Sequence, residues 1–490
     1  MNKKVVIVGA GLGGLATALR LSVNGYEVEI VEKHSTAGGR LNQIKKDGFT
    51  FDTGPSFFSM SYEFEKFASD CGIKLPFEYF ELDPLYSVHF RNREKPFHLY
   101  KNIDKLAEQF KEIEPNFKEN FEKYIGKAEA LFKDTVDLVI KRNFDSVLDY
   151  FLTLARVNPS HLPVLFRSFW QQVKLYFDSE EASQILSLVA FFLGKTPFDT
   201  MAVYTLLSYT EFRYDGYYNV SGGMYKITEG LVEELTKRGV KIHYNTEIKG
   251  YSSSPKRLDS VIDSTGKEWK ADIFIINADA PFFSGSVLGD AKYSADSLKK
   301  MDWTMGYLTF YVGIDCKLPD VNHHNYYLGA NYSEYAEKIK RELTSSETPY
   351  YYVNVLSKHN RECAPEGCES LFFVCPVPNL LYKDNWDDRE EYFSKIVNDF
   401  SARTGVDINS HIVTKSILTP EEWRDTFNLY MGSGLGLSHK FSQIGGLRPT
   451  NRHSKYNNTF FVGASTVPGA GLPMAIISSK LAAERVMSKK

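Results

Sequence analysis

The sequence predicts a mixed α/β fold built around one discontinuous domain, and three observations support this. Residues 4–8 form a short, apolar, β-branched run that is followed by a glycine-rich turn and a helical pattern. Residues 460–476, FFVGASTVPGAGLPMAI, form a second apolar, glycine-rich segment near the other end of the chain. Alternating runs such as TFYVGI at 309–314 and YYYVNVL at 350–356 are typical of an antiparallel sheet.

The first motif is a complete β-turn-α-β unit with glycines in G-x-G-x-x-G spacing. Such glycines allow a tight turn, close approach of the backbone to a pyrophosphate, and close helix–strand packing. Glu32 ends the second strand, where a carboxylate can bind a ribose diol. A structural turn without a ligand is the alternative, but strand, helix and acid together favour a Rossmann-like dinucleotide site. The expected contacts are Gly9, Gly11, Leu12, Gly13, Gly14 and Glu32.

The segment after Glu32 indicates which dinucleotide binds. It reads KHSTAGGRLNQ and then FTFDTGPSF, instead of continuing into further βαβ units as a nicotinamide dehydrogenase would. This pattern resembles flavoproteins of the amine-oxidase and phytoene-desaturase group, which implies FAD. The resemblance places the first stretch beside the phosphates, where Arg40 would neutralise charge, and the Gly-Pro segment near the flavin ring. The implied contacts are Lys33, Gly39, Arg40, Leu41, Gly54, Pro55 and Ser56; the alternative for Arg40 is a structural arginine.

The C-terminal motif suits the other end of FAD. A flavin ring needs a wall whose backbone N–H groups come close to its carbonyl edge, which glycines permit. A helix N-terminus there would stabilise negative charge on the reduced ring. The sequence predicts a strand at 459–462, a loop, and a helix that starts at Pro473, a residue suited to a first helical turn. We expect contacts from Gly463, Ala464, Gly471, Leu472, Pro473 and Met474.

The C-terminal motif and further blocks resemble the phytoene desaturase family of bacterial carotenoid desaturases along nearly the whole chain. The blocks include DGFTFDTGPS, VSGGMYKITEGLVEEL, ADIFIINADAP and the Leu447-Arg448-Pro449-x-Asn451-Arg452 stretch. The resemblance implies that Ile248 contacts the adenine and that Asn277, Ala278 and Asp279 lie at the cofactor. Val467, Met474 and Leu447 depart from the phytoene-type pattern. The overall pattern is closest to the 1-hydroxycarotenoid 3,4-desaturases.

Composition excludes some other classes of function. The formal net charge is -3 and the pI about 6.4, so no basic excess points to nucleic acid. The five cysteines have no metal-ligand spacing, so we expect no metal site and reduced thiols in a cytoplasmic protein. No apolar run approaches the roughly 20 residues that span a bilayer.

The predicted domains follow from the positions of these motifs. Residues 1–75, 220–290 and 445–490 would form the FAD-binding domain, and residues 76–110 and 291–444 an antiparallel-sheet substrate domain. Residues 111–219 would form a helical subdomain. Within it, Tyr150–Phe177 lacks Asp and Glu and carries large apolar residues, as expected of a helix pair at a membrane interface. A buried helix pair with snorkelling cations is the alternative. The family favours peripheral attachment to the inner face of the cell membrane.

The implied reaction removes two hydrogens from adjacent carbons of a polyene. Flavin N5 would accept a hydride, and a proton would leave to a weak base, water or the reduced flavin. Asp149 and Arg156 are weak catalytic candidates, for which surface charges are the stronger interpretation. Asp52 and Asp279 are expected to cap turns, and His323 and His324 to be structural. No second G-x-G-x-x-G indicates NADPH, so oxygen or a membrane quinone is the expected electron acceptor.

Three alternatives remain. The first is a phytoene or diapophytoene desaturase, or a carotenoid isomerase, saturase or terminal oxidase on the same scaffold. The second is an amine oxidase with a polar substrate, although no aromatic cage or amine-binding carboxylate is identified. The third is a GDP-dissociation-inhibitor-like protein without catalysis, against which the flavin-ring motif at 463–474 argues.

Overall fold

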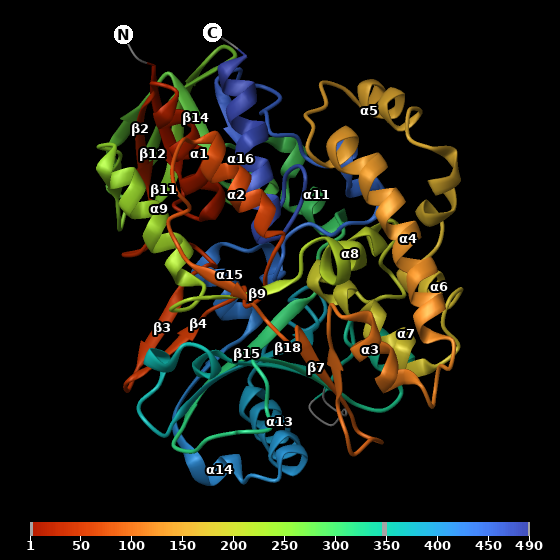
Figure 1. Cartoon of the computed structure of the whole chain (residues 1–490). Helices are drawn as coiled ribbons and strands as arrows, with labels where there is room; N and C mark the ends of the chain where they lie inside the picture. Colours follow the sequence, from red (N-terminus) through yellow and green to blue (C-terminus); the bar gives the residue numbers. More distant parts are fainter. Residues whose placement is uncertain (1–2, 345–349, 489–490) are drawn as a thin grey trace.

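A five-stranded parallel sheet joins segments from both ends of the chain (Figure 1). The computed structural model describes residues 3–344 and 350–488. The strand order is β10-β2-β1-β14-β20, so the predicted first strand lies at the centre. All four pairings are parallel, and Val8 aligns with both Val31 and Ile276. The strands are β1 (Lys4–Val8), β2 (Glu27–Val31), β10 (Lys241–His243), β14 (Ile273–Ile276) and β20 (Thr459–Phe461).

Both faces of this sheet are covered, which explains why β1 is apolar without alternation. Val5 and Ile7 face a core shared with the helices α1 (Leu12–Val23), α9 (Tyr225–Lys237) and α16 (Leu472–Met487). Val6 and Val8 face a second core under a small antiparallel sheet. That sheet contains β11 (Ile248–Ser254), β12 (Arg257–Asp263) and β13 (Glu268–Lys270).

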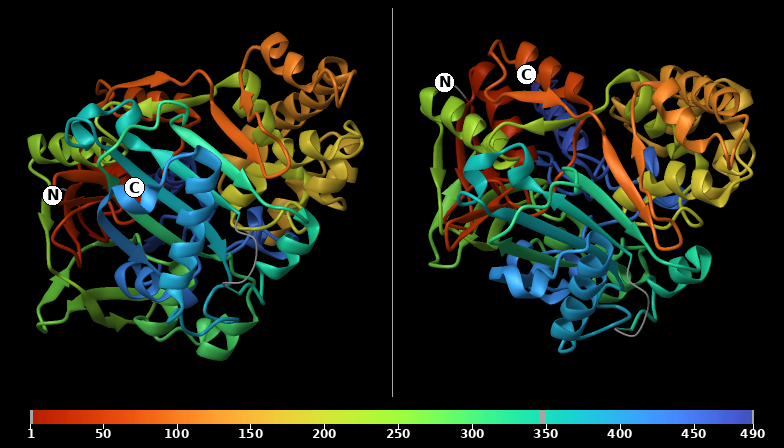
Figure 2. Two further views of the ribbon diagram at one scale, coloured as in Figure 1. Left: turned by 90° about the horizontal axis from the view of Figure 1, so that it is seen from below. Right: turned by 60° about the horizontal axis from the view of Figure 1, so that its bottom comes forward.

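A seven-stranded sheet forms the lower half of the molecule in Figure 1. It is antiparallel as predicted except for one pair, because β16 runs parallel to β7. One face is covered by α13 (Arg389–Thr404), whose Phe393 ring lies 5.2 Å from that of Phe310 (Figure 2). In spatial order the strands are β19 (Ile412–Leu418), β15 (Gly306–Ile314), β18 (Glu369–Val377), β17 (Tyr351–Val355), β16 (His324–Leu328), β7 (Tyr86–Phe90) and β8 (Phe97–Leu99).

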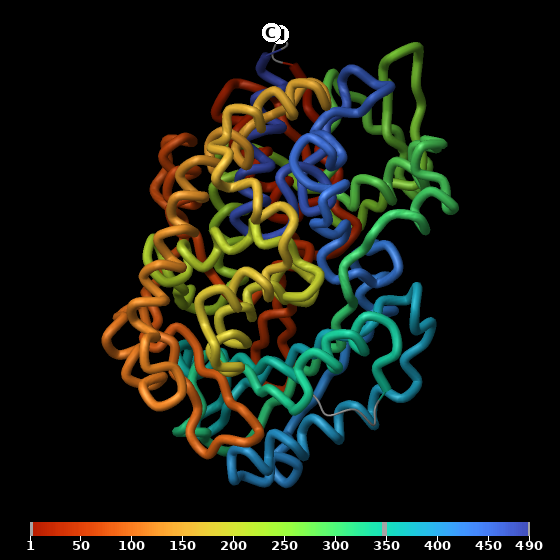
Figure 3. Tube along the Cα trace, turned by 90° about the vertical axis from the view of Figure 1, so that its right-hand side faces the viewer, coloured from red at the N-terminus to blue at the C-terminus, as the bar shows by residue number. Residues whose placement is uncertain are grey.

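The third region is helical and covers one side of the molecule (Figure 3). Its longest helix is α4 (Phe117–Thr135). The helix pair predicted within Tyr150–Phe177 is present as two short helices: α5 ends at Leu154, and a 3₁₀ segment separates it from α6. Pro159 starts this segment and Pro163 lies inside it, which excludes a continuous α-helix. The other helices here are α3 (Ile103–Phe110), α5 (Val147–Leu154), α6 (Phe169–Val173), α7 (Glu180–Ser187) and α8 (Leu206–Tyr209).

Short elements link the three regions. The strand β9 (Tyr217–Val220) pairs with β5 (Phe58–Ser59) and β6 (Tyr79–Glu81), and so connects the helical region to the parallel-sheet region. Within the described residues, no helix combines the length and apolarity needed to cross a bilayer. The remaining elements are β3 (Gln43–Lys46), β4 (Phe49–Asp52), α2 (Ser61–Asp70), α10 (Ala280–Ser286), α11 (Ala295–Lys300), α12 (Tyr332–Lys338), α14 (Ile408–His411) and α15 (Pro420–Phe427).

The predicted mixed α/β fold class is confirmed by this arrangement of one parallel sheet, antiparallel sheets and a helical region. The three segments predicted to share a domain each contribute at least one strand to the parallel sheet. The boundaries of the three domains remain predictions.

Candidate active site

A cavity of about 1230 Å³ lies where the three regions meet. It is lined by residues from both ends of the chain and by the faces of the helical region and the large sheet. Gly14 is the one predicted cofactor contact outside this lining. The lining includes Gly9, Gly11, Leu12, Gly13, Glu32, Lys33, Gly39, Arg40, Leu41, Gly54, Pro55, Ser56, Ile248, Asn277, Ala278, Asp279, Gly463, Ala464, Gly471, Leu472, Pro473 and Met474.

The first glycine turn is packed too tightly for side chains. A Cβ on Gly14 would lie 2.2 Å from the Gly9 carbonyl oxygen, and one on Gly9 would lie 2.5 Å from the Asn277 carbonyl oxygen. Gly9 also has a φ of +98°, which disfavours other residues. The Asn277 side chain donates to the Gly9 carbonyl at 3.1 Å and braces the turn from β14. Gly14 therefore acts through packing, and the turn leaves its backbone open to the cavity.

Glu32 lies at the carboxyl end of β2 with only 5% of its surface exposed. Its Oε2 accepts from Ala10 N at 2.7 Å and its Oε1 from His34 N at 2.9 Å. These bonds fix the carboxylate beside the glycine turn, and an ionised carboxyl has lone pairs left for further donors. A ribose diol can therefore bind here.

Arg40 is half-buried in the cavity wall between the two glycine-rich segments. Its Nη1 donates to the Gly434 carbonyl at 2.7 Å. Burial lowers the pKa of Arg40, whereas the nearby Asp279 carboxylate favours the charged form. A half-buried guanidinium that lines a cavity provides donors and charge suited to a phosphate.

Asp279 caps the helix that follows β14. Its carboxylate accepts from Phe282 N at 3.1 Å, as predicted for a capping residue, and from Ser465 Oγ at 2.5 Å. Asp52 likewise accepts from Met224 N at 3.0 Å, near the start of α9. Through its bond with Ser465, Asp279 ties the loop at 465 to the carboxyl end of β14. Asp279 also lines the cavity.

Two residues in the late block brace the C-terminal loop, and the sequence analysis assigned them no role. Arg448 is 2% exposed and donates to five carbonyls, those of Leu437, Ser438, Gln443, Ala464 and Thr466. Asn451 donates to the carbonyls of Phe461 and Val467. Both therefore hold the segment that follows β20. The only sequence feature that could have indicated this role is the family-like block in which both residues lie.

The helix α16 begins at the cavity. Gly471 precedes it with a φ of +124°, and Pro473 occupies its first turn, as predicted. Residues Gly471 to Ala475 all line the cavity. The N–H groups at this helix end and its dipole therefore favour an anionic or carbonyl-rich group.

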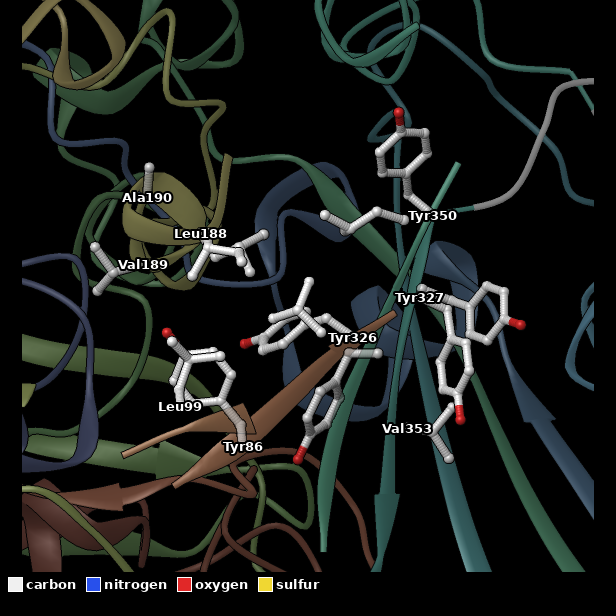
Figure 4. Close-up of a cluster of buried hydrophobic side chains, with 14 of the residues drawn as sticks. Tyr86, Leu99, Leu188, Val189, Ala190, Tyr326, Tyr327, Tyr350 and Val353 are labelled. Carbon is white, nitrogen blue, oxygen red and sulfur yellow. The ribbon is translucent and has the colours of Figure 1, made fainter. Parts of the chain in front are cut away.

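Beyond these residues the cavity continues as an apolar arm between the helical region and the large sheet. Tyr326 and Val374 come from the sheet. Figure 4 shows Leu188 and Val189 opposite Tyr86 and Tyr326, whereas Tyr327 extends from the other face of the sheet. The helical region contributes Leu131, Val136, Leu154, Leu188, Phe192 and Leu207. Such a wall suits a long hydrocarbon.

The weak catalytic candidates Asp149 and Arg156 do not line this cavity, although residues next to them do. Asp149 forms an ion pair with Arg142 at 2.9 Å in the first turn of α5, and Arg156 is exposed. Their neighbours Leu154, Ala155 and Val157 line the cavity instead. His323 and His324 are buried, and the His324 ring stacks on Phe57 at 3.9 Å, consistent with a structural role.

Comparison with known proteins identifies the family. The model of the flavin-containing amine oxidoreductases matches residues 12–487. The chain belongs to this family. A phytoene desaturase of Fusarium fujikuroi is 32% identical, with 99% of this chain and 90% of the relative covered. A carotenoid 3,4-desaturase of Haloarcula japonica is 30% identical, with 99% and 98% covered. Membership of the carotenoid desaturase group is therefore shown.

Solved structures confirm the fold of the chain. An oxidoreductase from Methanosarcina mazei has a TM-score of 0.65 at 15% identity, and the match covers 99% of this chain and 100% of the other. The protein is an FAD-dependent oxidoreductase, as the motifs predicted. The glycine turn, Glu32, Arg40 and the start of α16 fit FAD, because they offer acceptors for ribose and donors for phosphate and ring.

Proposed function

We propose that this member of the family introduces a C=C bond into an acyclic carotenoid, specifically by 3,4-desaturation of a 1-hydroxycarotenoid. The observation that supports this most is the continuity of one cavity from the glycine turns into the apolar arm. A small polar amine would leave that arm unfilled, whereas a polyene fills it. The named relatives act on carotenoids, which supports the same substrate class.

FAD, when bound, supplies the hydride acceptor for the oxidation. The chain's own residues position the reactants and exclude water. Arg448 and Asn451 fix the loop after β20, so the wall formed by Gly463 and Ala464 stays in place. The apolar arm aligns the polyene by shape and keeps the site dry. Most of the catalytic work of the protein is therefore orientation.

We further propose that the protein attaches peripherally to the inner face of a membrane. The helical region carries large apolar side chains that are strongly exposed, and Phe151 and Leu162 also line the cavity. A path from lipid into the apolar arm would spare the polyene contact with water. The described cysteines are free, which fits a reducing compartment. The exposed apolar patch contains Val147, Leu148, Phe151, Leu152, Leu162, Phe166 and Leu175.

A second candidate is desaturation of phytoene itself, because the phytoene desaturase relative is at least as similar as the 3,4-desaturase. The experiment mixes FAD-loaded protein without oxygen with liposomes that carry either a 1-hydroxylated acyclic carotenoid or phytoene. We expect flavin bleaching and a red-shifted polyene spectrum with the hydroxylated substrate. Turnover of phytoene alone would replace the first candidate by the second. Bleaching with neither would reject carotenoid desaturation.

Reoxidation of the flavin is proposed to use oxygen or a membrane quinone. Adding each acceptor to the bleached protein, with recovery of the oxidised flavin spectrum as the readout, tests this. A faster recovery with quinone in liposomes would support a membrane electron acceptor.

A further inference from the structure

Glu211 is the carboxyl group that lines the apolar arm of the cavity. The other lining carboxylates, Glu32, Glu247 and Asp279, come from the β2 and β14 ends and the segment before β11. Glu211 is 4% exposed and lies in a π-helical turn, Thr210–Tyr214, directly after α8. Such turns are rare and are found frequently at functional sites.

The surroundings of Glu211 are tyrosines and apolar side chains. The phenols of Tyr86 and Tyr217 lie close enough to its carboxyl group to lower its pKa, against the larger effect of burial. The Tyr86 ring lies 6.1 Å from that of Tyr217 and 5.6 Å from that of Tyr326. Figure 4 shows Tyr86 and Tyr326 on the same side of the sheet. Three phenols from β7, β9 and β16 therefore gather around this carboxyl group.

Two polar atoms in this cluster lack a partner. Among the described residues, neither Glu211 Oε1 nor the Tyr326 hydroxyl has a hydrogen-bond partner. Both residues line the cavity. A buried polar atom without a partner loses its hydrogen bonds to water and gains none in return, so it favours a ligand atom that can pair with it. Two of them beside one cavity point to a ligand atom that completes the bonding.

The protonation state of Glu211 indicates which kind of ligand group can pair with this cluster. Burial raises the pKa of Glu211 to about 8, so at neutral pH the group is mostly a neutral carboxylic acid. A neutral acid donates one hydrogen bond and accepts others. A hydroxyl group has the same dual capacity, whereas a hydrocarbon offers neither and a carbonyl only accepts. A neutral group also provides little attraction for a cation.

We propose that Glu211, Tyr217 and Tyr326 form a subsite that binds a hydroxyl group on the end of the polyene substrate. The subsite rests on the proposed function, because that function places a polyene in the apolar arm. The Tyr217 ring lies 4.8 Å from Phe57, which follows Gly54-Pro55-Ser56 in the cavity wall. The hydroxyl end is therefore held beside the expected flavin-ring wall. In a 1-hydroxylated end group, one methylene separates the hydroxyl carbon from the bond to be desaturated.

The subsite provides selection against unhydroxylated polyenes. A hydrocarbon end group would fill the same space but leave the cluster unpaired, and sites that bind a hydroxyl discriminate strongly against analogues lacking it. We expect the hydroxylated polyene to bind at least tenfold more tightly. A tenfold ratio corresponds to about 1.4 kcal/mol.

The test measures binding without turnover. FAD-loaded full-length protein is titrated with two already desaturated acyclic polyenes that differ in one terminal hydroxyl group, both supplied in the same liposomes. The dissociation constants are read from the induced circular dichroism of the bound polyene. Wild type should prefer the hydroxylated polyene at least tenfold. Glu211→Leu should abolish the preference, and Glu211→Gln should retain most of it because an amide also donates and accepts.

Two further variants keep the test decisive. Tyr326→Phe removes one hydroxyl and should lower the preference severalfold, even if Glu211→Leu does not fold. Thr210→Val is the matched control, because the Thr210 hydroxyl on the same turn already donates to the Leu207 carbonyl at 2.8 Å. It should leave the ratio of the two constants unchanged.

The outcomes separate this proposal from the proposed function. Equal binding of the two polyenes by wild type, with both end groups desaturated in the turnover assay, would refute the subsite and keep the carotenoid desaturase. An undiminished preference in Glu211→Leu and Tyr326→Phe would also refute the subsite. Failure of wild type to bind or desaturate either polyene would overturn both proposals together.

Discussion

Gly14 does not line the cavity, but it supports the cofactor site through packing. The Gly9 carbonyl oxygen leaves no room for a side chain at this position. In Gly14→Ala the new Cβ would meet the Gly9 carbonyl oxygen at 2.2 Å. We expect a loss of about 3 kcal/mol in stability and of bound FAD, measured by thermal unfolding and flavin absorbance. The control is Gly126→Ala in α4, an exposed position with no atom within 4 Å of the new Cβ. It should be neutral or stabilising by up to about 1 kcal/mol.

Arg448 satisfies five carbonyls with one side chain, which an ammonium group with three donors cannot do. Arg448→Lys should therefore destabilise the loop after β20 by about 3 kcal/mol and increase the rate at which FAD dissociates. Flavin fluorescence during dilution measures that rate. Arg452→Lys, the same change at an exposed position of the same block, should leave the rate unaltered. A normal rate in Arg448→Lys would show that the brace is dispensable.

His439 makes stability depend on pH. Burial, assisted by the charge of Arg448, lowers the pKa of His439 to about 3 in the folded protein, against an ordinary value of 6.5. The unfolded chain therefore binds a proton below pH 6.5 that the folded chain excludes until about pH 3. Stability is lost as pH falls through this window, by about 1.4 kcal/mol per pH unit for this group. His439→Gln should reduce the loss between pH 6 and pH 4 in denaturant titrations; an unchanged slope would contradict this.

At the scale of the element, the segment from α5 to α6 combines helical turns with an exposed apolar surface. Leu148 and Phe166 are 67% and 81% exposed. Replacing both by Ser should weaken binding to anionic liposomes at least tenfold, because each large side chain contributes about 1.5–3 kcal/mol when buried. Vesicle sedimentation measures this, and thermal stability should change little.

The control for this surface is the pair Val413→Ser and Tyr382→Ser, each 51% exposed and outside the patch. This double variant should bind vesicles as wild type does. Equal loss in the two double variants would mean that general surface hydrophobicity, and not this segment, governs attachment.

At the scale of the whole molecule, FAD should stabilise the fold because its expected contacts come from all three segments of the parallel-sheet region. A ligand at a hundred times its dissociation constant adds about 2.7 kcal/mol. The midpoint of thermal unfolding should therefore rise with added FAD. Glu32→Gln should show a smaller rise, because an amide has one acceptor oxygen where the carboxylate has two.

The cofactor end could be predicted from the sequence because its signals are local. A strand, a glycine turn and an acid follow one another from Lys4 to Glu32, and their spacing fixes their geometry. The roles of Arg448 and Glu211 could not be predicted in this way. Arg448 acts through carbonyls of distant segments, and Glu211 gains its phenol neighbours Tyr86 and Tyr217 from β7 and β9. These contacts exist only after the sheets have assembled.

Two details of the architecture could not be predicted from pattern alone. The two helices within Tyr150–Phe177 are short, because Pro159 and Pro163 lie in the 3₁₀ segment between them. The parallel pairing of β16 with β7 joins strands far apart in the chain, and alternation within each strand carries no information about its neighbour's direction. The sequence pattern therefore predicted where strands and helices occur better than it predicted which strands pair and in which direction.

The strand order also has a consequence for how the chain acquires its shape during synthesis. Strand β14 is synthesised long before its outer neighbour β20, because β15 to β19 of the seven-stranded sheet lie between them in the chain. Pairings between such distant segments form slowly and leave apolar edges uncovered meanwhile. The nascent chain should therefore expose the unpaired, apolar edge of β14 for more than a third of its elongation, from Ile276 to Thr459 of 490 residues. Chaperones, cofactor supply and translation speed should then govern the yield of active protein.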